Sequence, residues 1–261
     1  MRRASSILAV LVLGVLAIPA AASAAPTIHL KAQLIPIKGY PHTGDILGAG
    51  AGLKTEVTVE STEYGGYPPP IRGVTLQFPT GTKIDTSGFV TCPTATLVEA
   101  KEPEKCPKAS KAGPPGRAEG FVVFGGETVE EEVTIESFFA PGGGVNFFVA
   151  GHHPAIIEIT SKGKFTSLGN SGGFGPKFFA EVPLVETVPG ANDASTHKFT
   201  VEVGAAHGKG KHIVYYGKVP TKCPKGGFPL KIEVLFEAPT FAPVTSSTTY
   251  SAPCPPASRK K

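Results

Sequence analysis

Short runs in which apolar and polar residues alternate are the feature that most constrains how this chain folds. Val74, Leu76 and Phe78 alternate with Thr75 and Gln77. A period of two places the apolar side chains on one face of a strand, so each run predicts a half-buried β-strand. The pattern recurs at 56–60, 132–136, 199–203 and 231–237. Further strands are predicted near 27–37, 117–125, 144–151, 155–166, 177–188, 212–219 and 245–251.

Glycine and proline separate these runs and exclude a helical bundle. The chain has 32 glycines and 26 prolines, which is 58 of its 261 residues, and both are the least favourable residues in a helix interior. Only residues 94–105 contain several good helix formers, and Pro103 ends that stretch early. We therefore expect an all-β fold, a single two-sheet β-sandwich of jelly-roll type, with about twelve strands and at most one short helix near 94–105.

The N-terminus has the three parts of a secretory signal peptide. Arg2 and Arg3 form a basic region, residues 7–18 are apolar, and Ala22-Ser23-Ala24 is a small-residue cleavage site. Twelve apolar residues are too few to span a bilayer as a helix. We expect residues 1–24 to be removed, residues 25–252 to form the domain, and residues 253–261 to be a basic tail. A two-domain division near 165–176 is the alternative. After cleavage we expect no transmembrane segment and a secreted or extracellular protein, either released or associated with the cell wall.

Four cysteines predict structural disulfides in such a compartment. They are Cys92, Cys106, Cys223 and Cys254, each followed by proline. Three connectivities are possible, and proximity in sequence favours Cys92–Cys106 with Cys223–Cys254. Zinc binding is disfavoured because the chain has no C-x-x-C motif. We expect no metal and no cofactor.

The segment Gly169-Asn170-Ser171-Gly172-Gly173 satisfies G-x-S-x-G. A nucleophile elbow requires a helix after the serine, whereas here another strand follows. The segment is also similar to the serine loop of chymotrypsin-like proteases, with His42 and Asp85 upstream in that family's order. Both lie in turn-like sequence, and nothing indicates that they orient a nucleophile. We expect a non-enzymatic protein, with a serine hydrolase that uses Ser171 as the alternative.

Other polar clusters have simpler interpretations than catalysis. Glu130, Glu131 and Glu132 fit the start of a strand with exposed carboxylates, and His152-His153 would point to opposite faces of a strand. Removing two arginines with the signal leaves a net charge of about +2, which does not favour a nucleic-acid partner.

Two segments are candidate binding surfaces. Tyr64 and Tyr67 lie in a Tyr-Pro-rich loop, and Lys209 and Lys211 lie in a basic segment expected at the edge of a hairpin. The expected partner is a cell-wall polymer or another envelope protein, and a polysaccharide-binding module is a further alternative.

Ordered Cys-Pro motifs support a resemblance to a known family. The first half consists of Phe78-Pro79-Thr80-Gly81, Cys92-Pro93 and Cys106-Pro107-Lys108-Ala109-Ser110-Lys111-Ala112-Gly113. The second half consists of Lys209-Gly210-Lys211, Tyr215-Tyr216 and Cys223-Pro224-Lys225-Gly226-Gly227. Together they resemble an uncharacterised secreted all-β protein family of high-GC Gram-positive bacteria. The resemblance implies secretion, an all-β fold and two local disulfides, and it implies no catalytic residues. The expected function is that of a structural or binding protein of the cell envelope or extracellular space.

Overall fold

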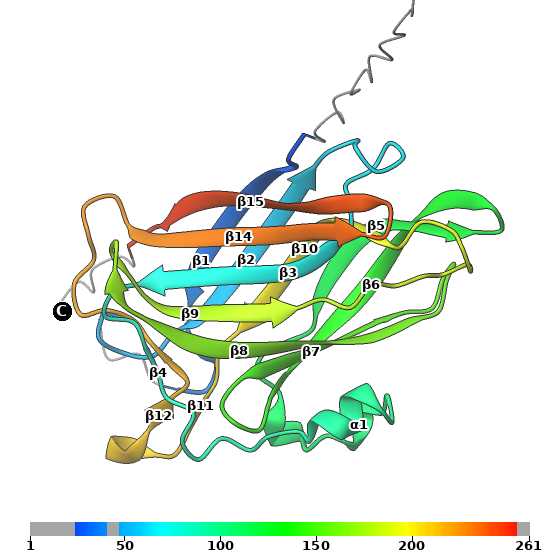
Figure 1. The fold of residues 1–261 in the computed structure, drawn as a ribbon. Coiled ribbons are helices and arrows are strands. Elements are labelled where there is room, and N and C mark those ends of the chain that lie inside the picture. Colours follow the sequence, from blue (N-terminus) through cyan, green and yellow to red (C-terminus); the bar gives the residue numbers. More distant parts are fainter. Residues whose placement is uncertain (1–23, 41–46, 255–261) are drawn as a thin grey trace, which may run out of the picture.

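One antiparallel sheet of eleven strands dominates the structure (Figure 1). The computed structural model describes residues 24–40 and 47–254. The spatial order of the strands is β1-β2-β10-β5-β6-β7-β8-β9-β3-β14-β15. Their bounds are β1 (Thr27–Ile35), β2 (Gly52–Glu60), β3 (Ile71–Pro79), β5 (Gly116–Phe124), β6 (Glu127–Phe139), β7 (Val145–Gly151), β8 (Ile157–Ser171), β9 (Phe174–Glu181), β10 (Ser195–Val203), β14 (Phe228–Ala238) and β15 (Phe241–Ala252).

Short elements gather below this sheet in the view of Figure 1. Two pairs of two-residue strands are present, β4 with β13 and β11 with β12. One short α-helix, α1, and three short 3₁₀ helices complete the secondary structure of the described residues. Their bounds are β4 (Lys83–Ile84), α1 (Thr94–Val98), η1 (Pro103–Lys105), η2 (Lys108–Ser110), β11 (Ala206–His207), η3 (Gly210–His212), β12 (Val214–Tyr215) and β13 (Gly217–Lys218).

Alternation along the strands produces one apolar face. In β14, every second residue is buried, and the intervening Lys231 and Glu233 pair on the other face with Nζ and Oε1 2.7 Å apart. Phe236 and Val234 are fully buried, and they pack in one cluster with Ile28 of β1 and Val57 of β2. Strands from both edges of the sheet therefore share one core.

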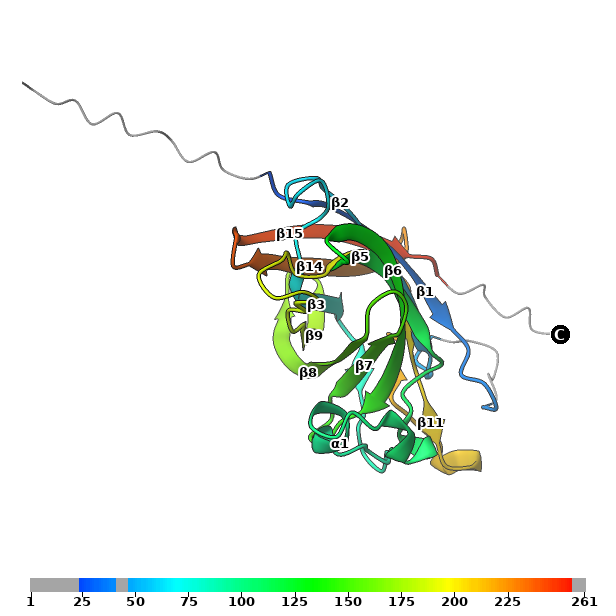
Figure 2. The ribbon, with the colours of Figure 1, turned by 90° about the vertical axis from the view of Figure 1, so that its right-hand side faces the viewer.

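The sheet curls until its two edges meet, so that it is nearly closed into a barrel (Figure 2). Each strand is antiparallel to its neighbours, and with eleven strands the edge strands β1 and β15 run in the same direction. No backbone ladder joins β1 to β15 in the described parts of the chain. Instead the buried Ser246 hydroxyl of β15 donates a hydrogen bond to the carbonyl of Pro26, just before β1.

The predicted two-sheet sandwich is wrong, although the all-β class and the one short helix are confirmed. Alternation gives a strand one apolar face in a sandwich and in a curled sheet alike, so it does not distinguish them. The two architectures differ in which strands pair with one another. Here β10 pairs with both β2 and β5, and β3 pairs with both β9 and β14, so all eleven strands belong to one sheet. The predicted strand at 212–219 forms only the two-residue strands β12 and β13.

Both favoured disulfides are present. Cys223–Cys254 joins the open end of the β14–β15 hairpin, with Cα atoms 5.9 Å apart. Cys92–Cys106 encloses α1 and η1, with Cα atoms 5.2 Å apart. Two disulfides indicate an oxidising environment.

The loop closed by Cys92–Cys106 covers the outer face of the sheet at β6 and β7. Leu97 of α1 packs with Phe138 and Phe148, and its carbonyl accepts a hydrogen bond from Thr160 Oγ1 at 3.0 Å. The end of β6 is therefore buried on both faces, which explains its run of three buried residues at 137–139.

Removing the Cys92–Cys106 disulfide tests this role. The double variant Cys92→Ala/Cys106→Ala should unfold with a free energy about 3 kcal/mol lower, because a closed loop of this length restricts the unfolded chain. Urea unfolding followed by circular dichroism measures the change, with Cys223→Ala/Cys254→Ala as the matched variant. An unchanged urea midpoint would show that the loop is held by packing alone.

Candidate functional site

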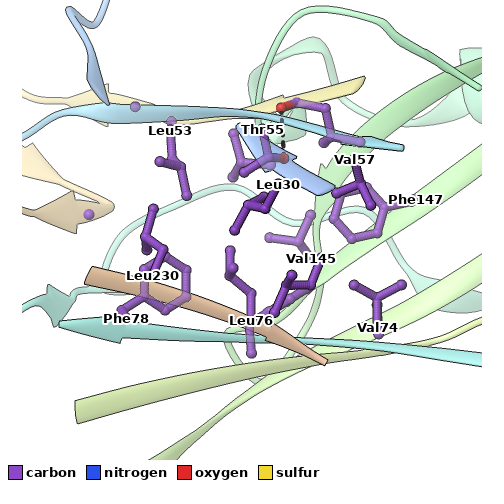
Figure 3. Close-up of a pocket in the computed structure, with 18 of the residues that line it drawn as sticks. Leu30, Leu53, Thr55, Val57, Val74, Leu76, Phe78, Val145, Phe147 and Leu230 are labelled. Carbon is purple, nitrogen blue, oxygen red and sulfur yellow. Dashed lines mark hydrogen bonds between the residues drawn. The ribbon is translucent and has the colours of Figure 1, made fainter. Parts of the chain in front are cut away.

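A cavity of about 290 Å³ lies inside the curled sheet. All eleven strands of the sheet contribute to its lining. In Figure 3, Leu53 and Val57 of β2 face Leu76 and Phe78 of β3 across the open space. The cavity therefore occupies the interior that the closure of the sheet creates.

The wall of this cavity is almost entirely apolar. Leu53, Val74 and Leu76 face inward yet are only half-buried. Their incomplete burial follows from the unfilled space that they line. The remaining apolar lining residues include Leu30, Leu34, Val133, Ile135, Val145, Phe147, Val149, Ile159, Phe165, Phe178, Phe199, Val201, Leu230 and Ile232.

The polar side chains of the wall are largely satisfied by the backbone. Thr55 Oγ1 donates to the carbonyl of Val201 at 3.3 Å, and Ser161 Oγ donates to the carbonyl of Glu181 at 2.5 Å. Tyr216, at one end, donates from its hydroxyl to the carbonyl of Gly143 at 3.1 Å. Burial raises the pKa of Tyr216, so this phenol stays protonated. The donors of these three hydroxyls are therefore already used by the backbone.

Partly exposed polar residues mark the rim of the cavity near Tyr216. Thr82 and Lys218 line it there, and Lys218 Nζ lies 3.9 Å from Asp85 Oδ2. The pKa of Asp85 is lowered, chiefly by the Ser87 hydroxyl that donates to Oδ1 at 2.5 Å, then by the Ser87 N–H and by Lys218. An ionised carboxylate and an ammonium group thus lie where the cavity approaches solvent.

Two of the three residues considered for a serine hydrolase, Ser171 and Asp85, lie in the part of the chain that the structure describes. Ser171 ends β8, and its backbone pairs with Phe174 across a turn into β9, so strands flank it on both sides. Asp85 is hydrogen-bonded to Ser87 rather than to a histidine. His42 lies outside the described residues, as does the signal segment 1–23.

The tyrosine surface predicted from sequence is largely internal. Tyr64 is only 6% exposed, its ring packs edge-on against Phe241, and its hydroxyl accepts a hydrogen bond from the Asp193 N–H at 3.1 Å. The Tyr67 ring packs at a tilt against Phe121, with ring centroids 4.3 Å apart. Tyr64 is therefore a core residue and offers no exposed platform.

The predicted lysines lie on the surface, between β11 and β12 in the chain rather than in the tyrosine loop. Lys209, the residue before η3, and Lys211, within η3, are both exposed. Neither forms an ion pair with any residue of the described chain. His152 and His153 lie in the loop after β7. Within residues 24–40 and 47–254, no group of three or more His, Cys, Asp or Glu side chains is arranged to hold a metal ion.

Comparison with known proteins identifies no relative. The chain matches no protein-family model, no curated protein and no solved structure. The family resemblance suggested by the Cys-Pro motifs therefore stays a prediction. Among the described residues, no helix has the length and apolar character needed to span a membrane.

The lowered pKa of Asp85 predicts a pH-dependent stability. Because its folded-state pKa lies below its unfolded value, its contribution is present above the unfolded pKa and is lost as pH falls through the folded pKa. Asp85→Asn should therefore lower the urea midpoint at pH 7, and the difference from wild type should shrink towards pH 3. Ser87→Ala, which removes the main hydrogen bond, should reproduce part of the effect. A difference that is constant with pH would contradict this assignment.

Proposed function

We propose that this chain is a secreted, non-enzymatic binding protein that holds an apolar small molecule inside its curled sheet. The observation that carries the proposal is the cavity of about 290 Å³ with an apolar wall drawn from every strand of the sheet. Its size is at the lower end of small-molecule pockets, which occupy about 300–1,000 Å³. Interiors of folded proteins are normally packed with few voids larger than a water molecule.

The physical driving force for such binding is the removal of apolar surface from water. Each Å² of apolar surface buried contributes about 25 cal/mol. The hydroxyls of Thr55, Ser161 and Tyr216 already have backbone partners. An apolar ligand would therefore leave no polar group of these side chains unpaired.

The extracellular location is part of the same proposal. It is supported by the disulfides Cys92–Cys106 and Cys223–Cys254 and by the signal-like sequence at 1–24. A carrier of apolar molecules in this compartment would shield its ligand from water while the ligand moves between membrane, cell wall and medium.

Titration with the hydrocarbon fluorophore 1,6-diphenyl-1,3,5-hexatriene tests the binding function. The mature protein should bind about one equivalent with increased fluorescence. Val74→Trp places a large ring in the cavity and should weaken binding at least about tenfold, because the ring occupies the ligand's space. The matched control is Gln77→Trp on the same strand but on its other face. The chain has no natural tryptophan, so the emission of each variant also reports whether its new ring is buried.

Two outcomes would overturn the proposal. One is the absence of saturable binding by the folded wild-type protein. The other is equal binding by Val74→Trp and Gln77→Trp when circular dichroism shows that both are folded.

Retention at the cell wall is a second candidate function, favoured by the exposed Lys209 and Lys211, which form no ion pair with another described residue. Anionic wall polymers would attract both ammonium groups, and salt would screen that attraction. Co-sedimentation with purified cell walls should fall as salt rises, and the variant Lys209→Ala/Lys211→Ala should show reduced sedimentation at low salt. Lys31→Ala, at a lysine paired with Glu56, serves as the control. Equal sedimentation of all three proteins would contradict this role.

A further inference from the structure

A second cavity, of about 70 Å³, continues the first along the strands. The two cavities share seven lining residues, so a single layer of side chains separates them. On β6, the successive inward positions are Glu131 in the second cavity, Val133 in both, and Ile135 in the first. Further along the same face, Phe139 contacts Tyr216 near the Lys218 rim. Glu131 and Phe139 are eight residues apart, which is roughly 27 Å along a strand, so Glu131 lies at the end remote from the rim.

Glu131 is a carboxylate in apolar surroundings. It is 3% exposed, whereas its neighbours Glu130 and Glu132 lie on the outer face with side chains 68% and 63% exposed. The cavity around it is lined largely by apolar residues, among them Val122, Val133, Val149, Ile157, Ile159, Val182, Leu184, Val185 and Ala194. A buried carboxylate is normally paired or fully hydrogen-bonded.

Only one oxygen of Glu131 has a hydrogen-bond partner among the described residues. Oε2 accepts a hydrogen bond from the Ala155 N–H at 3.0 Å. Oε1 is buried and accepts no hydrogen bond from any described residue. Gly151 makes room for this carboxylate, because a Cβ there would lie 2.6 Å from Oε1. A buried acceptor left without a donor is unfavourable, so a donor from outside the chain would be stabilised here.

We propose that the ligand is an apolar chain with a hydrogen-bond donor at one end, a hydroxyl or amine group, which donates to Glu131 Oε1. This inference rests on the proposed binding function and specifies the chemistry of the ligand. The apolar chain occupies the main cavity and the donor enters the second cavity. The ligand lies along β6, with its donor end towards Glu131 and its other end towards the Lys218 rim.

Competition between two isomers tests the inference. 1-Dodecanol and undecyl methyl ether have the same atoms, but only the alcohol has an O–H donor. Each is used to displace the hydrocarbon fluorophore 1,6-diphenyl-1,3,5-hexatriene from the mature protein. A purely apolar cavity favours the ether, because burying an unpaired hydroxyl is costly. The wild-type protein should instead bind the alcohol more tightly.

Glu131→Gln separates the role in recognition from a role in folding. The amide oxygen can still accept from the Ala155 N–H, while the amide NH₂ takes the place of the free oxygen and can only donate. The preference for alcohol over ether should fall about tenfold or invert, and binding of the hydrocarbon fluorophore, which has no donor for Oε1, should be retained. Glu132→Gln, one residue along on the outer face, is the matched control and should keep the wild-type preference.

The outcomes distinguish this inference from the function on which it rests. If the fluorophore binds and the wild-type protein prefers the ether, the donor-bearing ligand is excluded while the apolar binding function stands. An unchanged preference in Glu131→Gln, including the case in which water already satisfies Oε1, also overturns the inference. Failure of the fluorophore and of both isomers to bind overturns the binding function itself.

Discussion

Burial of one continuous apolar face is the constraint on which the rest of the structure depends. Most of the eleven strands carry apolar residues at alternate positions on the same side, as β14 does from Phe228 to Phe236. A flat sheet of this width would expose that face to water. The intrinsic twist of strands allows the sheet to curl instead, so that its apolar face covers itself. The interior cavity follows from this curling, because a ring of eleven strands encloses more volume than its side chains fill.

Closing an odd number of antiparallel strands leaves a seam that side chains must hold. The edge strands β1 and β15 run in parallel, and the contacts across the seam include the hydrogen bond from Ser246 to Pro26 and the shared apolar cluster. The Cys223–Cys254 disulfide fixes the hairpin that forms one side of this seam. The seam itself is therefore held by that hydrogen bond and by apolar packing, since no backbone ladder joins β1 to β15 among the described residues.

The sequence allows the strands and disulfides to be predicted, but not their arrangement in space. A period of two is a local property, so Val74, Leu76 and Phe78 are correctly assigned to one face of a strand. Which strands lie side by side depends on contacts distant in sequence, such as β2 with β10. The burial of Tyr64 could not be predicted either, because its partners Phe241 and Asp193 are far along the chain.

Glu131 shows that a site residue can be hidden in a pattern that has a simpler interpretation. Three consecutive glutamates at the start of a strand are typical of a solvated segment. The period of the strand nevertheless requires the middle one to face opposite to its neighbours. Since Val133 and Ile135 of the same strand face inward, Glu131 must face inward with them. The alternation that builds the apolar wall thus also places one carboxylate inside it, at the end of the interior opposite to Lys218. The two ends of the interior therefore carry different polar groups. This difference can orient a ligand that apolar contacts alone would leave free to bind in either direction.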